Sequence, residues 1–76
     1  MAISIYTTPT CSYCTMAKNW FKENGIKYTE YNVAQDRQRG DEMVRKSGQM
    51  GVPVLDVNGR IIIGFDKPKI EQALHR

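Results

Sequence analysis

One stretch decides how this chain folds, and it reads Tyr6-Thr7-Thr8-Pro9-Thr10-Cys11-Ser12-Tyr13-Cys14. An alternating apolar run precedes it and apolar residues at helical spacing follow it, so it predicts a strand, a loop and the start of a helix. Both cysteines of the chain lie in it, and Thr10 is the expected helix N-cap. We therefore expect Cys11 at the N-terminus of the helix and Cys14 one turn inside it.

This placement of the two cysteines suits a dithiol–disulfide couple. The thiolate is the form of cysteine that attacks a disulfide, and the free N–H groups and dipole at a helix N-terminus stabilise a negative charge. We therefore expect Cys11 to be the partly exposed attacking thiol. The helix turn brings the sulfur of Cys14 back toward Cys11, so Cys14 is expected to resolve the mixed disulfide.

A zinc site and a structural disulfide are the alternatives for this cysteine pair. Zinc takes four ligands, and beyond the two cysteines the chain offers only His75, far along the sequence. Met1 leads almost directly into the first strand and leaves no room for a signal peptide, so the expected location is cytoplasmic. In that compartment a cysteine pair is more often catalytic than structural.

The size and charge of the chain limit its partners. Its 76 residues predict a single domain over residues 1–76. The net charge is +3 and no basic run is interleaved with aromatic residues, so a nucleic-acid partner is not expected. No apolar stretch is long enough to span a bilayer. We expect a monomer without membrane contacts, without a metal and without a permanently bound cofactor.

The rest of the chain predicts an α/β architecture with one four-stranded mixed sheet and three helices, in the order βαβ, helix, ββα. The first helix places Trp20 and Phe21 in the core and ends at Asn24-Gly25. A strand over residues 26–33 is polar enough to be an edge strand. The remaining expected elements are a helix from Gln35 to Gly48, a hairpin turning at Asn58-Gly59, and a last helix capped by Asp66 with Pro68 in its first turn.

Three motifs carry a resemblance that covers essentially the whole chain. Cys11-Ser12-Tyr13-Cys14 is similar to Cys-Pro-Tyr-Cys, Gly51-Val52-Pro53 to Thr-Val-Pro, and Ile63-Gly64-Phe65-Asp66 to a Gly-Gly-x-Asp turn. With these motifs the chain resembles the glutaredoxins and glutaredoxin-like redoxins of the thioredoxin superfamily. The resemblance implies a minimal thioredoxin fold and a thiol–disulfide oxidoreductase that reduces protein disulfides or glutathione mixed disulfides.

The resemblance also implies how a substrate binds. Pro53 would be cis and face the cysteines, and it would turn the backbone of Val52 toward a substrate that pairs as an added strand. Glutathione would be the co-substrate, with its γ-glutamyl end held at the turn after the fourth strand. The other substrate-binding residues implied in this way are Tyr13, Gly64, Phe65 and Asp66.

Departures from the family pattern keep two alternatives open. Thr8 stands where many glutaredoxins have Lys or Arg, and Ile63 replaces the first glycine of the turn. These changes are compatible with an electron carrier that thioredoxin reductase reduces, for example one that serves ribonucleotide reductase, although such redoxins have arginine where Asp66 stands. Ser12 removes a proline that hinders two such domains and two glutathiones from sharing an iron–sulfur cluster. That cluster-binding module is the second alternative.

Overall fold

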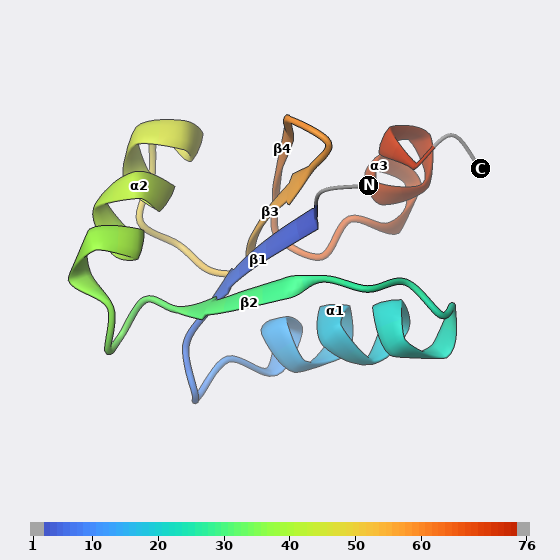
Figure 1. Ribbon diagram of the computed structural model, residues 1–76, viewed down its shortest axis with the longest axis horizontal. Helices are drawn as coiled ribbons and strands as arrows, with labels where there is room; N and C mark the ends of the chain where they lie inside the picture. The colour runs from blue at the N-terminus through green and yellow to red at the C-terminus, as the bar shows by residue number, and fades with distance from the viewer. Residues whose placement is uncertain (1–2, 75–76) are drawn as a thin grey trace.

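The computed structural model describes residues 3–74, which form four strands and three helices (Figure 1). In chain order these are β1 (Ile3–Thr7), α1 (Ser12–Glu23), β2 (Thr29–Asn32), α2 (Arg37–Ser47), β3 (Val54–Val57), β4 (Arg60–Ile63) and α3 (Lys67–Ala73). The predicted α/β class and element order are confirmed. None of these helices combines the length and the apolar character that crossing a membrane requires.

The four strands form one mixed sheet in the order β2-β1-β3-β4. β1 runs parallel to β2 and antiparallel to β3, and β3 runs antiparallel to β4. β2 is therefore an edge strand, as its polar sequence predicts. The turn between β3 and β4 has φ of 55° at Asn58 and 90° at Gly59, which are the positive values that the predicted type I′ hairpin turn requires.

Side chains alternate across the sheet and divide the core into two layers. Ile5, Leu55 and Ile62 are buried in the larger cluster with residues of α1 and α3, including Phe21. Tyr6 and Val54 are buried in a second cluster with Met43 of α2. α1 and α3 therefore cover one face of the sheet, and α2 covers the other.

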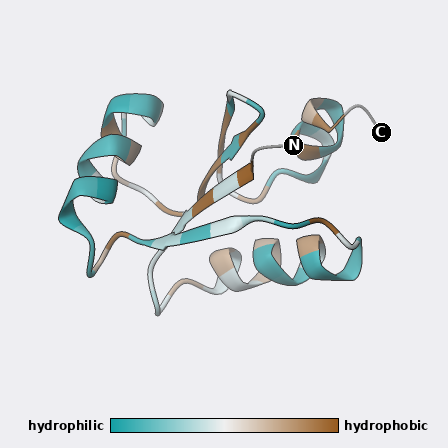
Figure 2. Cartoon of the chain, in the orientation of Figure 1, coloured by the Kyte–Doolittle hydropathy of each residue, from teal (hydrophilic) through white to brown (hydrophobic). Residues whose placement is uncertain are grey.

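α2 differs from the other helices because Met43 is its one buried residue. Figure 2 shows the contrast between this largely hydrophilic helix and the hydrophobic β1. Polar contacts hold α2 on the sheet instead. The Tyr6 hydroxyl donates to Glu42 Oε1 at 3.0 Å, and Lys46 Nζ donates to Tyr6 Oη at 3.1 Å and to Asp56 Oδ2 at 2.8 Å. Hydrogen bonds from Arg39 and then Tyr6 lower the pKa of Glu42 to about 2.

The start of the second strand differs from the sequence prediction. The second strand begins at Thr29 rather than at residue 26, because the Ile26 N–H donates to the Phe21 carbonyl at 2.9 Å and closes the end of α1. The third strand begins at Val54, one residue after Pro53. The predicted helix ends are confirmed, with Gly25 and Gly48 in left-handed conformations at φ of 66° and 75°.

Candidate active site

Cys11 itself occupies the N-cap of α1, so the prediction that Thr10 is the cap is wrong. The backbone of Cys11 is extended, with φ −102° and ψ 110°, and its Sγ accepts a hydrogen bond from the backbone N–H of Cys14 at 3.2 Å. A sulfur that accepts this bond does the work of a serine or threonine cap. The same bond would stabilise a negative charge on the Cys11 sulfur.

The Val52–Pro53 segment lies directly against this sulfur. The thiol of Cys11 donates to the carbonyl oxygen of Val52 at 3.7 Å, although 41 positions separate the two residues. The peptide bond between Val52 and Pro53 is cis, as the resemblance implies. Pro53 is buried and Val52 is half-buried, so the Val52 carbonyl contacts the Cys11 sulfur close to the protein surface.

The two thiols lie in different environments. Cys11 is half-buried, whereas Cys14 is buried with 1% of its surface exposed, and neither forms a disulfide. Burial and then the neighbouring Cys11 sulfur raise the pKa of the Cys14 thiol to about 12. A substrate can therefore reach Cys11 from solvent, but it cannot reach Cys14 without first displacing its surroundings.

The turn from Gly64 to Asp66 is fastened to the same segment. The N–H of Gly64, whose φ is 81°, donates to the carbonyl oxygen of Pro53 at 2.8 Å. Asp66 caps α3 by accepting the Lys69 N–H at 3.3 Å, as predicted, and the N–H of Ile70 donates to the Asp66 carbonyl at 2.9 Å. Phe65 packs against the larger core cluster. The position of this turn relative to Pro53 is thus fixed by a backbone hydrogen bond.

Comparison with known proteins identifies the family. The family model described as Glutaredoxin matches residues 3–62. The chain belongs to the glutaredoxin family. It is 40% identical over 74 residues to the glutaredoxin-like 8.6 kDa protein in the rubredoxin operon of Clostridium pasteurianum, covering 97% of this chain and 99% of that protein. It is 31% identical over 64 residues to glutaredoxin 3 of Escherichia coli strain K12, covering 84% and 77% of the two chains.

Solved structures confirm that this member of the glutaredoxin family has a thioredoxin-like fold. The thioredoxin-like protein BC3987 superposes with a TM-score of 0.87 at 27% identity, covering 93% of this chain and 97% of that chain. The NrdH-redoxin of Escherichia coli, a glutaredoxin-like protein with a thioredoxin-like activity profile, superposes with a TM-score of 0.83 at 26% identity, covering 95% and 93%. The predicted fold and family are both confirmed.

Exposed apolar side chains lie on α1 and at the end of β4, directly before the turn. Tyr13 is 61% exposed, and Ile63, directly before Gly64, is 55% exposed. A shallow hollow of about 250 Å³ lies between α1 and the start of α3, where Met16 and Phe65 are part of its lining. Of the predicted substrate residues, Tyr13 is thus exposed and Phe65 lines this hollow.

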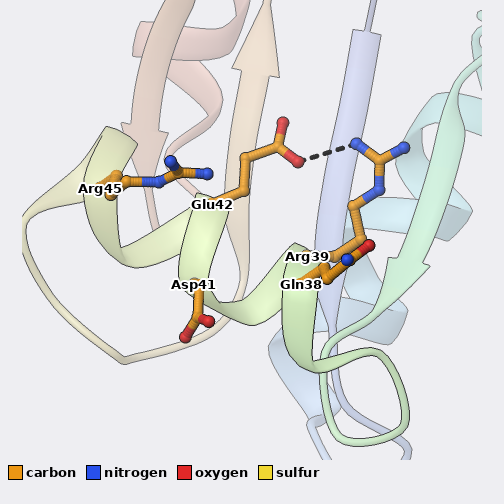
Figure 3. A pocket seen from close by; sticks show the side chains of 5 residues that line it. All are labelled: Gln38, Arg39, Asp41, Glu42 and Arg45. Atoms are coloured by element: carbon orange, nitrogen blue, oxygen red, sulfur yellow. Dashed lines mark hydrogen bonds and ion pairs between the residues drawn. The ribbon is translucent and has the colours of Figure 1, made fainter.

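A larger hollow of about 670 Å³ contains none of the predicted site residues. It runs along α2 and is lined by charged and polar side chains, which are Gln38, Arg39, Asp41, Glu42 and Arg45 (Figure 3). Arg39 Nη1 and Glu42 Oε2 are 2.7 Å apart, so these two charges already satisfy each other. The hollow with the greater volume is therefore not the candidate active site. The candidate active site is the cysteine pair, because its thiols are the groups that can exchange with a disulfide.

Metal ligands do not gather within residues 3–74, where no group of three His, Cys, Asp or Glu side chains could hold an ion. His75, the one further ligand considered for a zinc site, lies outside the described residues.

The sequence pattern missed one cluster of polar side chains near Cys14. Lys18 Nζ donates to Glu30 Oε2 at 3.0 Å. The hydroxyl of Thr7, a residue only 1% exposed, donates to the same oxygen at 2.7 Å. The spacing of four residues between Cys14 and Lys18 was the one available signal, because it puts both on one helix face.

Proposed function

We propose that this glutaredoxin-family redoxin reduces protein disulfides and glutathione mixed disulfides through its two cysteines. One observation carries the proposal: the Sγ of Cys11 accepts the Cys14 N–H at the start of α1, while Cys14 is buried behind it. This arrangement supports an accessible attacking thiolate and a protected second thiol three residues away.

The proposed reaction has two exchange steps. The Cys11 thiolate attacks one sulfur of the substrate disulfide, the other sulfur leaves as a thiolate, and a mixed disulfide remains on Cys11. Cys14 then attacks the Cys11 sulfur, so that the bound thiol leaves and a Cys11–Cys14 disulfide forms. Two glutathione molecules would restore the dithiol and become glutathione disulfide. We assign this reaction to the cytoplasm, where cellular thiols keep such pairs reduced.

The substrate would bind between the Val52–Pro53 segment and the turn after β4. The backbone of Val52 lies beside the Cys11 sulfur and would pair with the substrate backbone. The turn of Gly64, Phe65 and Asp66 would hold the γ-glutamyl end of glutathione, with the Asp66 carboxylate receiving its ammonium group. The hydrogen bond from Gly64 to Pro53 supports this assignment, because it fixes the two binding segments relative to each other. Tyr13 would flank the bound substrate from α1.

The second candidate is an electron carrier that thioredoxin reductase reduces. The likeness to the NrdH-redoxin of Escherichia coli favours it, because that protein has a thioredoxin-like activity profile. Thr8 and the exposed Ile63 also favour it, since Thr8 supplies no cation for a glutathione carboxylate and Ile63 adds bulk beside the turn.

Two parallel assays separate the candidates. Both follow NADPH oxidation with a small glutathione mixed disulfide as substrate; one contains glutathione and glutathione reductase, and the other contains only a thioredoxin reductase. Cys11→Ser is the blank for both. The proposed glutathione-dependent function predicts activity in the first assay. Activity in the second assay alone would replace it with the carrier, and a Cys11→Ser protein as active as the parent would overturn both.

A further inference from the structure

A lysine lies one helical turn beyond the buried thiol. Cys14 and Lys18 are four residues apart on α1, so their side chains share one face of the helix. Cys14 is 1% exposed, and the side chain of Lys18 is only 26% exposed. The remaining buried residues of this face, Ala17 and Phe21, are apolar. The positive charge of Lys18 therefore lies on the same helix face as the Cys14 sulfur and acts on it, in the direction that lowers the pKa of Cys14.

Two residues of the sheet hold Lys18 in this position. Glu30 lies on β2 opposite Ile5 of β1, and its Oε2 accepts hydrogen bonds from both Lys18 Nζ and Thr7 Oγ1. Thr7 is buried at the end of β1, so its hydrogen bond fixes the position of the Glu30 carboxylate. The hydrogen bonds from Thr7 and then Lys18 lower the pKa of Glu30, and the bond to Glu30 raises the pKa of Lys18. Both side chains are therefore charged at neutral pH.

The charge on Lys18 favours deprotonation of Cys14, which the resolving step requires. Cys14 must lose its proton to attack, but burial, the largest cause, raises the pKa of its thiol. In that step the Cys11 sulfur belongs to the mixed disulfide, so it carries no charge that could repel a second thiolate. A backbone hydrogen bond at Thr8 and the positive charge of Lys18 both act in the opposite direction and lower the pKa of Cys14.

We propose that Lys18, held by Glu30 and Thr7, is a positioning residue that stabilises the Cys14 thiolate in the resolving step. The inference rests on the proposed dithiol function. In that step Cys14–SH and the Cys11–S–S–R mixed disulfide give the Cys11–Cys14 disulfide and RSH. The S–S bond to R breaks, the bond between the two cysteines forms, and the proton of Cys14 goes to the departing thiolate.

The size of the effect follows from two opposing trends. For each unit by which removal of the Lys18 charge raises the pKa of Cys14, the thiolate population falls about tenfold at neutral pH. A more basic thiolate is also a better nucleophile, which returns about threefold of that loss. We therefore expect the resolving step of Lys18→Gln to be slower at neutral pH, by about threefold for each unit by which the pKa of Cys14 rises.

Stopped-flow reaction with dithiobisnitrobenzoate measures the two steps separately, because each releases one yellow thiolate. The first phase reports attack by Cys11 and the second reports resolution by Cys14, and Cys14→Ser identifies the second phase by abolishing it. Lys18→Gln is expected to slow only the second phase, and Lys18→Arg to restore it. Lys27→Gln is the matched control, because it makes the same charge change at an exposed site.

Glu30→Gln distinguishes this role from a merely structural ion pair. The amide oxygen still accepts from Thr7 and Lys18, but the negative charge that offsets Lys18 is gone. The proposal therefore predicts a second phase at least as fast as that of the parent. The rate of the second phase is measured across pH, because two further groups affect the ion pair. Lys22 lowers the pKa of Glu30, and Tyr28 raises the pKa of Lys18. Urea titration confirms that each variant is folded at the assay conditions.

Two results would overturn the inference. One is a second phase of Lys18→Gln that equals that of Lys27→Gln, and the other is a Glu30→Gln variant slowed as much as Lys18→Gln. Both would leave the proposed function intact. By contrast, a parent protein that shows neither phase would contradict the proposed function itself.

Discussion

The attachment of α2 depends on charge, and Glu42→Gln tests this dependence. Glu42 receives hydrogen bonds from Tyr6 and Arg39, and Lys46 Nζ lies 3.2 Å from its Oε1. A fall of its pKa from 4.5 to about 2 corresponds to an upper bound of about 3.4 kcal/mol, at about 1.36 kcal/mol per unit. The side chain is 24% exposed, and ion pairs near the surface contribute about 0–1 kcal/mol each. We therefore expect Glu42→Gln to lower the free energy of unfolding by about 1–2 kcal/mol at neutral pH.

The pH dependence of this loss has a definite sign. Because folding lowers the pKa of Glu42, its ionised form stabilises the protein above pH 4.5, and this contribution disappears as the pH falls toward 2. The parent and the variant should therefore differ at neutral pH and converge near pH 2. Urea titrations followed by the fluorescence of Trp20, which is 9% exposed, measure both differences.

Glu71→Gln on α3 is the matched control, because Glu71 is exposed and forms none of the hydrogen bonds or ion pairs described for residues 3–74. It should change the free energy of unfolding by less than about 0.5 kcal/mol. A Glu42→Gln variant as stable as the parent at neutral pH would refute the electrostatic attachment of α2. An equal loss at neutral pH and near pH 2 would also refute it, because packing rather than charge would then explain the loss.

Four further substitutions test the core, the interior and the end of α2, and the proposed glutathione site. Phe21→Ala should cost about 3–5 kcal/mol in urea unfolding, because Phe21 is fully buried against α3 and the sheet, and a loss below about 1 kcal/mol would contradict this packing. Gly40→Ala should stabilise α2 by about 0.5–1 kcal/mol, since the new Cβ would lie 3.6 Å from the nearest atom, the Val33 carbonyl oxygen. Gly48→Ala, at φ 75°, should instead destabilise by about 1 kcal/mol, and equal effects at the two glycines would contradict the assigned helix end. Asp66→Asn keeps a good N-cap but removes the charge, so melting should be unchanged while the KM for a glutathione mixed disulfide rises several-fold; an unchanged KM would remove Asp66 from the proposed site.

Local signals in the sequence predicted much of the fold. Asn58-Gly59 predicted the hairpin, and Gly48 and Asp66 predicted helix ends, because each of these residues acts on its own few neighbours. The cysteine pair likewise predicted the start of α1. The cap itself was misassigned because Thr10 has the usual capping hydroxyl, and nothing in the sequence shows that the Cys11 sulfur takes that bond instead.

Contacts between distant residues could not be read from the sequence. Tyr6 and Glu42 are 36 positions apart, and Thr7 and Glu30 are 23 apart. The register of β1 against β2 and the placement of α2 decide these contacts, and single-residue patterns carry no information about either. In the sequence alone, Lys18 and Glu30 are therefore indistinguishable from ordinary surface charges. Their hydrogen bond forms only because β2 pairs with β1 and places Glu30 within reach of α1.

Trapping the mixed disulfide tests the division of roles between the two cysteines most directly. Cys14→Ser and Cys11→Ser proteins are each incubated with glutathione disulfide, and the intact mass and the modified residue are determined by mass spectrometry. The account predicts one glutathione on Cys11 in Cys14→Ser, because attack proceeds but resolution cannot, and no adduct on the buried Cys14 of Cys11→Ser. An adduct on Cys14 in Cys11→Ser, or none on Cys11 in Cys14→Ser, would contradict the account.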